Sequence, residues 1–166
     1  MVLNQTNLRG ILAQILSVNT KYIVPKQGNW WNPQEEVNSP HTWCAYLIRS
    51  NRPRTAPFYV SFNNQNLLAV EKIATIDLQF VGEKSEDIAQ SVAMWTNRSD
   101  VQEALAQVHG AIMYNDMEAK SSPFYQDGNN TVMAWNVTIR VLWYDVAETT
   151  QGRMPAVQLE GTINQL

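Results

Sequence analysis

The apolar positions of this chain follow two periods, one typical of helices and one typical of strands. Over residues 3–18 they recur every three or four residues, which places them on one helical face: Leu8, Ile11, Leu12, Ile15 and Leu16. Over residues 131–146 they alternate instead, and the residues that share one side are Val137, Ile139, Val141 and Trp143. We therefore predict an N-terminal helix and a long strand near the C-terminus.

Three more strands are predicted in the first half of the chain. Residues 41–49 are apolar on both faces, as in a central, buried strand. Residues 58–62 and 67–81 follow, and the second stretch alternates strictly, so that a wet face would carry Thr75, Asp77 and Gln79. Gly82 ends this strand.

Two consecutive helices are predicted over residues 85–97 and 99–110, the second with capping-box spacing at Ser99 and Gln102. A strand is predicted over residues 111–117. Turn-forming residues predict loops over residues 22–40, 50–57 and 120–130. The resulting order is α, β, β, β, α, α, β, β. It indicates a single domain of the α/β (α+β) class over residues 1–166, with an extended hairpin near residues 49–70 and a C-terminal tail over residues 148–166.

Composition indicates that part of the surface meets other protein. Only 16% of residues are charged, against roughly 25% in typical soluble domains. The chain also has 6 Trp, 6 Tyr and 4 Phe, and aromatic residues are enriched at interfaces. A net charge of −3 without a cluster of cations argues against sequence-specific DNA binding, because the nearest approach to a basic patch is Arg49, Arg52 and Arg54.

Compartment and membrane association follow from simpler features. The lone Cys44 excludes an internal disulfide and fits a reducing compartment, so we expect synthesis in the cytoplasm. The N-terminus has no basic leader, and polar residues interrupt its apolar positions. We therefore expect neither a signal peptide nor a membrane-spanning helix.

Residues that could perform catalysis are scattered. His41 and Cys44 are three apart, which points them to opposite faces of a strand. The acidic pairs, such as Glu35 with Glu36, lie in loops, at a helix start or near strand ends, where solvated surface is the simpler interpretation. No metal-binding spacing or phosphate-binding glycine loop is present. We therefore predict that the protein is not an enzyme and uses no cofactor or metal; a small hydrolase using His41 or His109 is an alternative.

Three groups of residues are predicted to contact partners. Trp30 and Trp31 are adjacent in a loop, where they either anchor that loop or contact a partner. Phe58, Tyr59 and Phe62 favour an intersubunit hairpin with an uncharged tip. The tail carries the third group, Val157, Leu159 and Ile163, whose apolar side chains need a partner beyond the last strong strand.

The order of several stretches resembles the tail terminator proteins of tailed bacteriophages, also called neck terminator or tail completion proteins. After the N-terminal helix, these stretches are Trp31-Asn32-Pro33, the strand over residues 76–82, the helix over residues 100–106, the strand over residues 135–144 and Glu160-Gly161-Thr162-Ile163. The likeness covers most of the chain. It rests on order and spacing and includes no catalytic signature.

The resemblance implies a mixed, mostly antiparallel sheet flanked by helices. It also implies a homohexameric ring that caps the tail tube and joins it to the neck, with DNA passing through the lumen without sequence-specific binding. The implied partners are the tail tube protein, a neck or head-completion protein and, in a contractile tail, the sheath protein. The implied location is the virion, after assembly in the host cytoplasm. The main alternative is another head-completion or tail ring protein.

Overall fold

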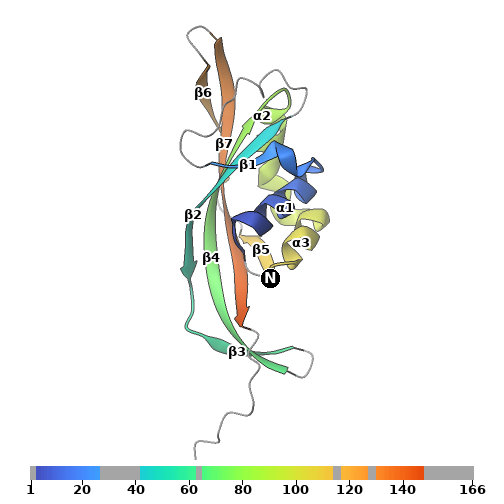
Figure 1. Ribbon diagram of the computed structural model, residues 1–166, viewed down its shortest axis with the longest axis vertical. Coiled ribbons are helices and arrows are strands. Elements are labelled where there is room, and N and C mark those ends of the chain that lie inside the picture. Colours follow the sequence, from blue (N-terminus) through green and yellow to red (C-terminus); the bar gives the residue numbers. More distant parts are fainter. Residues whose placement is uncertain (1–2, 27–41, 63–64, 114–116, 127–129, 148–166) are drawn as a thin grey trace, which may run out of the picture.

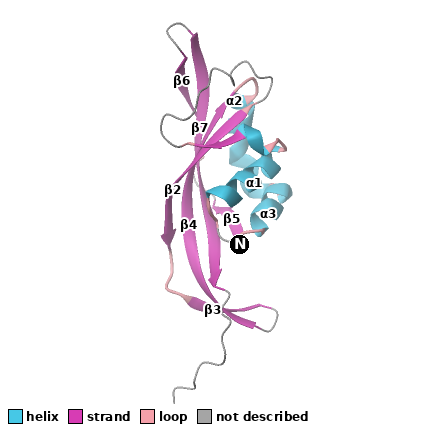
Figure 2. Ribbon diagram, viewed as in Figure 1, coloured by secondary structure: helices cyan, strands magenta, loops and turns pink. Residues whose placement is uncertain are grey.

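In the computed structural model the protein has two layers, with the helices packed on one face of a seven-stranded sheet (Figure 1 and Figure 2). The sheet is antiparallel except where its first strand pairs with the second in parallel. This confirms the predicted α+β fold with a mixed, mostly antiparallel sheet. The structure describes residues 3–26, 42–62, 65–113, 117–126 and 130–147.

The strands are, in chain order, β1 (Ile23–Pro25), β2 (Trp43–Pro53), β3 (Phe58–Phe62), β4 (Gln65–Val81), β5 (Gly110–Met113), β6 (Lys120–Gln126) and β7 (Asn130–Ala147). The long strands β4 and β7 pair along the centre of the sheet. Along its other edge β4 pairs with β3 over residues 65–69 and with β2 over residues 72–81. Along its other edge β7 pairs with β6 over residues 130–136 and with β5 over residues 140–143. The two long strands therefore pair with every other strand except β1, which pairs with β2.

The helical layer consists of α1 (Gln5–Leu16), the 3-10 helix η1 (Thr20–Tyr22), α2 (Ser85–Ser91), the 3-10 helix η2 (Val92–Asn97) and α3 (Ser99–Ala106). The first helix begins where the Asn4 side chain accepts a hydrogen bond from the Asn7 amide, at 2.9 Å. It ends at Ser17, whose φ of 53° is left-handed. The predicted helix over residues 85–97 is present, but it continues as a 3-10 helix after Ser91.

The core lies between the sheet and the helices and matches both predicted apolar patterns. The helical stripe of α1 is buried from Leu8 to Ile15, and the dry side of β7 is buried from Val137 to Trp143. Alternate residues of β4 also line the core: Ile76, Leu78 and Phe80 are at most 1% exposed. Gly82, with φ at 125°, ends β4 as predicted.

The predicted loop over residues 120–130 is wrong, because residues 120–126 form β6 along β7. Pro123 lies opposite Met133 in this pairing, and an edge strand tolerates a proline, which removes only one backbone donor. Likewise β2 continues to Pro53, into the predicted polar turn, because its backbone pairs with β4 as far as Lys72.

Three smaller predictions are also wrong. Residues 23–25 form β1, where a loop was predicted. Gln79 was expected on a wet face but is 7% exposed, paired with Ala45, which is 1% exposed. Ser99 does not cap the third helix, because it is already that helix's first residue, and Gln102 donates instead to the Thr96 carbonyl at 3.2 Å.

Candidate interaction surfaces

The groups that could perform chemistry do not gather in the described part of the chain. No three His, Cys, Asp or Glu side chains there are close enough to hold a metal ion. Cys44 is 1% exposed, and burial raises the pKa of its thiol. A buried thiol with a raised pKa stays protonated at neutral pH and is a poor nucleophile. Its suggested partner, His41, lies outside the described residues.

The side of the sheet opposite the helices is covered by no described helix (Figure 2). We call the side chains of β2, β4 and β7 on this side, together with Arg54 just after β2, the helix-free face. Pairing places most of these residues in cross-strand rows, which alternate with the rows that form the core. Arg49 lies at a register shift of β2 and Arg54 beyond its last pair, and their ion pairs with Asp77 and Glu71 place them on the same side. The middle of the face contains Leu47, Arg49, Arg52, Glu71, Ile73, Thr75, Asp77, Thr138, Arg140, Leu142 and Tyr144.

Asp77 organises the centre of the helix-free face. Its carboxylate accepts a hydrogen bond from the Thr138 hydroxyl at 2.7 Å and another from Arg49 Nε at 2.9 Å. The Asp77 side chain is 19% exposed, and that of Arg49 is 65% exposed. One carboxylate therefore joins β2, β4 and β7, and it uses Arg49 to do so.

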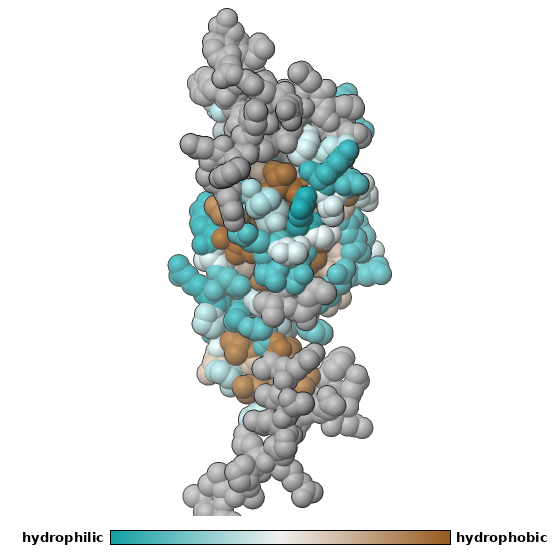
Figure 3. Space-filling view, viewed as in Figure 1, coloured by the Kyte–Doolittle hydropathy of each residue, from teal (hydrophilic) through white to brown (hydrophobic). Residues whose placement is uncertain are grey.

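The sheet extends past the helices as an arm formed by β3 and the adjoining ends of β4 and β7 (Figure 1). Phe58 and Tyr59 on this arm are 36% and 53% exposed. The Phe58 ring meets the Tyr144 ring edge-on, with centroids 6.2 Å apart. Apolar side chains gather over the arm in Figure 3. An exposed aromatic surface of this kind is typical of protein interfaces.

A cluster around Glu71 fixes the base of the arm. The Tyr144 hydroxyl donates to one oxygen of Glu71 at 3.2 Å, and Arg54 contacts the other oxygen at 3.2 Å. The hydrogen bond to Glu71 raises the pKa of Tyr144, as do desolvation and the charge of Glu71, while Arg54 acts in the opposite direction. Tyr144 therefore remains a neutral donor that connects β7 to β4.

One segment of the helical layer, on the opposite side of the sheet, is rich in carboxylates. We call residues 83–103, which include α2, η2 and the start of α3, the acidic helix segment. It contains five carboxylates against the two cations Lys84 and Arg98. Glu83, Glu86 and Asp87 are exposed. Met94, on the same segment, is 62% exposed.

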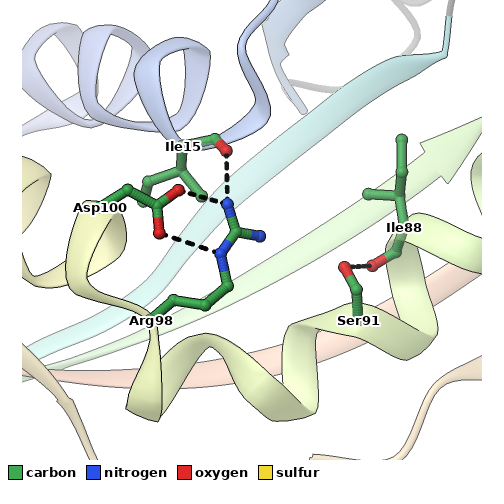
Figure 4. Close-up of polar contacts among 5 residues, drawn as sticks. All are labelled: Ile15, Ile88, Ser91, Arg98 and Asp100. Carbon is green, nitrogen blue, oxygen red and sulfur yellow. Dashed lines mark hydrogen bonds and ion pairs between the residues drawn. The ribbon is translucent and has the colours of Figure 1, made fainter.

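Arg98 is occupied within this helical layer, as Figure 4 shows. Its Nε donates to Asp100 at 3.0 Å, and one terminal nitrogen reaches the Ile15 carbonyl at the end of α1, at 3.4 Å. The hydrogen bond with Asp100 raises the pKa of Arg98 and lowers the pKa of Asp100. Ser91 donates to the Ile88 carbonyl at 2.7 Å beside this contact. The Arg98 contacts hold the start of α3 against the end of α1. The remaining carboxylates of the segment form no ion pair with a described cation.

Comparison with known proteins now identifies the family. Residues 6–165 match the family described as phage neck terminator protein. The chain belongs to this family. No curated protein matches the chain. Membership shows that this neck terminator has a structural role in the phage tail and neck, and it places the protein in that part of the virion.

The structure describes only some of the residues predicted to contact partners. In this neck terminator Phe58 and Tyr59 lie exposed on the arm, and Phe62 is the last residue of β3. The others lie outside the described residues: Trp30, Trp31, Val157, Leu159 and Ile163. Sequence reasoning missed Arg140 and Met94, because neither belongs to a motif. Each becomes notable only through its exposure on a folded surface.

None of the described helices is long and apolar enough to cross a membrane. Membership in a family of structural neck proteins favours assembly over catalysis for this chain.

Proposed function

We propose that the chain assembles into a homohexameric ring that caps the phage tail tube and joins the tail to the neck, with DNA passing through the lumen. The family match over residues 6–165 supports this role. The observation that carries self-assembly is the arm, where Phe58 and Tyr59 are exposed beside the paired ends of the two long strands. Aromatic side chains bury much area at low entropic cost, so they are suited to anchor a neighbouring subunit.

The partners of this ring are the tail tube protein on one side and a neck or head-completion protein on the other, with the sheath protein added in a contractile tail. Assembly takes place in the host cytoplasm. The mechanism requires no catalytic residue, metal or cofactor. DNA passes without sequence-specific contacts, in keeping with a chain whose net charge is −3.

We expect the purified chain to form closed rings, alone or on isolated tail tubes. Negative-stain imaging and mass photometry measure ring shape and copy number. The double variant Phe58→Ala/Tyr59→Ala should form rings at least about tenfold less readily, since interface anchors often contribute about 2 kcal/mol or more. Met133→Ala removes another exposed apolar side chain, 47% exposed, outside the arm and should assemble normally. A chain that stays monomeric and ignores tail tubes would contradict the proposed function.

The C-terminal residues Val157, Leu159 and Ile163 are proposed to contact a neighbouring subunit. Deletion of residues 155–166 should leave a folded subunit with impaired ring formation or tube attachment, because α1 and the long strands precede the deletion. Circular dichroism measures the fold, and size-exclusion chromatography measures assembly. If the shortened chain unfolds, the tail packs into the core of its own subunit and the proposed contact with a neighbour is wrong. If it assembles and caps tubes normally, the tail is dispensable.

A further inference from the structure

The helix-free face and the acidic helix segment carry charges of opposite sign. The helix-free face has four arginines, Arg49, Arg52, Arg54 and Arg140, and only two carboxylates, Glu71 and Asp77. The acidic helix segment has five carboxylates and two cations. A chain with a net charge of −3 does not require this separation. It arises because the fold sorts the charged residues onto different sides of one sheet.

Ion pairs within one copy of the chain involve only some of the charged side chains on each surface. On the helix-free face Arg49 contacts Asp77 and Arg54 contacts Glu71, while Arg52 and Arg140 have no ion pair within the described residues. On the acidic helix segment Asp100 pairs with Arg98. The carboxylates left without an ion pair in the described structure are Glu83, Glu86, Asp87 and Glu103.

Both surfaces also have an apolar component. Leu47, Ile73 and Leu142 lie half-buried on the helix-free face, and Ile73 is paired with Leu142 across the strands and with Arg52 on the other side. Met94 is 62% exposed on the acidic helix segment. A half-buried apolar row flanked by arginines matches a protein surface with apolar and acidic groups better than it matches a phosphate backbone.

The positions of these surfaces determine what kind of contact they can make. They lie on opposite sides of the same two-layer unit (Figure 1), so one copy cannot bring them together. Two copies can, if the face of the first meets the helices of the second. Such a contact is head-to-tail, and repetition of a head-to-tail contact closes into a ring when the rotation allows.

We propose that in the assembled ring the helix-free face of each copy packs on the acidic helix segment of the next copy. The occupant of this face is thus a second copy of the chain, selected by complementary charge, and the inference rests on the self-assembly proposed above. Opposite charges at such a contact steer association and exclude wrong partners. Arg52 and Arg140 are the arginines that remain for the neighbour.

Charge reversal tests this arrangement without disturbing an internal ion pair. Variant A carries Arg52→Glu and Arg140→Glu, and variant B carries Asp87→Lys and Glu103→Lys. In variant A both surfaces are acidic, and in variant B both are basic. Each alone should assemble at least roughly tenfold less readily than the unmodified chain, because like charges meet at every contact. A matched control, Lys21→Glu/Lys26→Glu, makes the same change in net charge as variant A outside both surfaces and should assemble normally.

The decisive test restores opposite charges at the contact, either by mixing the two variant proteins or by joining their substitutions in one chain. An equimolar mixture of A and B should form rings in which the two alternate, because acidic and basic surfaces then meet at every contact. A chain carrying all four substitutions should assemble with itself for the same reason. Mass photometry measures both, and circular dichroism melting shows that each variant is folded. Rings of the unmodified chain should also weaken between 0.1 and 1 M salt, where the screening length falls from about 10 Å to about 3 Å.

The possible failures are distinguishable. If the unmodified chain forms no ring in solution or on tail tubes, the proposed function is wrong and this contact falls with it. If it forms rings and variants A and B do so equally well, only the inferred contact is wrong. If variant A assembles normally but its rings lose retention of double-stranded DNA in a gel-shift assay, the helix-free face lines the lumen and the inference is overturned.

Discussion

Trp143→Ala should lower the free energy of unfolding by about 3–5 kcal/mol, the cost of removing a large aromatic side chain from a core. Trp143 is 0% exposed on β7. Its indole nitrogen donates to the Asn51 side chain at 3.0 Å, and the Lys72 ammonium lies 5.2 Å from the ring centroid. Lys72 also pairs with Asp145. Truncation therefore removes a large buried ring together with a contact to β2 and a contact to β4.

Urea denaturation at fixed chain concentration measures this loss. Tyr59→Ala is the matched control, because it removes an aromatic side chain that is 53% exposed and should change the stability of the subunit by no more than about 0.5 kcal/mol. Equal midpoints for the two variants would mean that Trp143 does not lie on the dry side of its strand.

Trp95→Ala should have an effect of similar size, about 3–5 kcal/mol, through a different part of the core. Trp95 lies on η2 and is 1% exposed. It belongs to the cluster of buried residues that joins the helices to the sheet. Its loss should loosen the helical layer, so near-ultraviolet circular dichroism should weaken at denaturant concentrations where the far-ultraviolet signal of the sheet persists. Simultaneous loss of both signals would contradict this order of unfolding.

Replacement of each tryptophan by phenylalanine separates the two sites. Trp143→Phe removes a hydrogen bond to Asn51, whereas the Trp95 indole nitrogen is buried without a partner among the described residues. Trp95→Phe therefore removes an unsatisfied donor, and we expect it to cost less than Trp143→Phe by about 1 kcal/mol. A larger cost for Trp95→Phe would show that its indole nitrogen has a partner.

The apolar periods of the sequence determined the elements that build the core. The stripe of α1 and the alternation of β7 are buried as predicted, because a residue's side of a helix or strand depends only on its position within that element. The sequence also predicted Phe58 and Tyr59 as interface residues; both are exposed on the arm, and their contact with a partner stays a prediction. The order of the elements was sufficient for the family resemblance, which the match over residues 6–165 confirms.

Tertiary structure decided the edges of the sheet. The strand β6 has a polar sequence with a proline, and it forms because the backbone of β7 offers unpaired groups along residues 130–136. The same holds for the end of β2 along β4 and for β1 along β2. Backbone pairing of this kind is almost independent of side-chain pattern, so no period in the sequence predicts it.

The sorting of charge was likewise decided only by the folded chain. Arg52 and Arg140 are far apart in sequence, and each alone is an ordinary surface cation. The pairing of β2 with β4 and of β4 with β7 places them on one face, opposite the carboxylates of residues 83–103. Composition fixed the net charge of −3. Its division into a basic face and an acidic segment depends on strand register, because a shift of one residue would turn each side chain to the other side of the sheet.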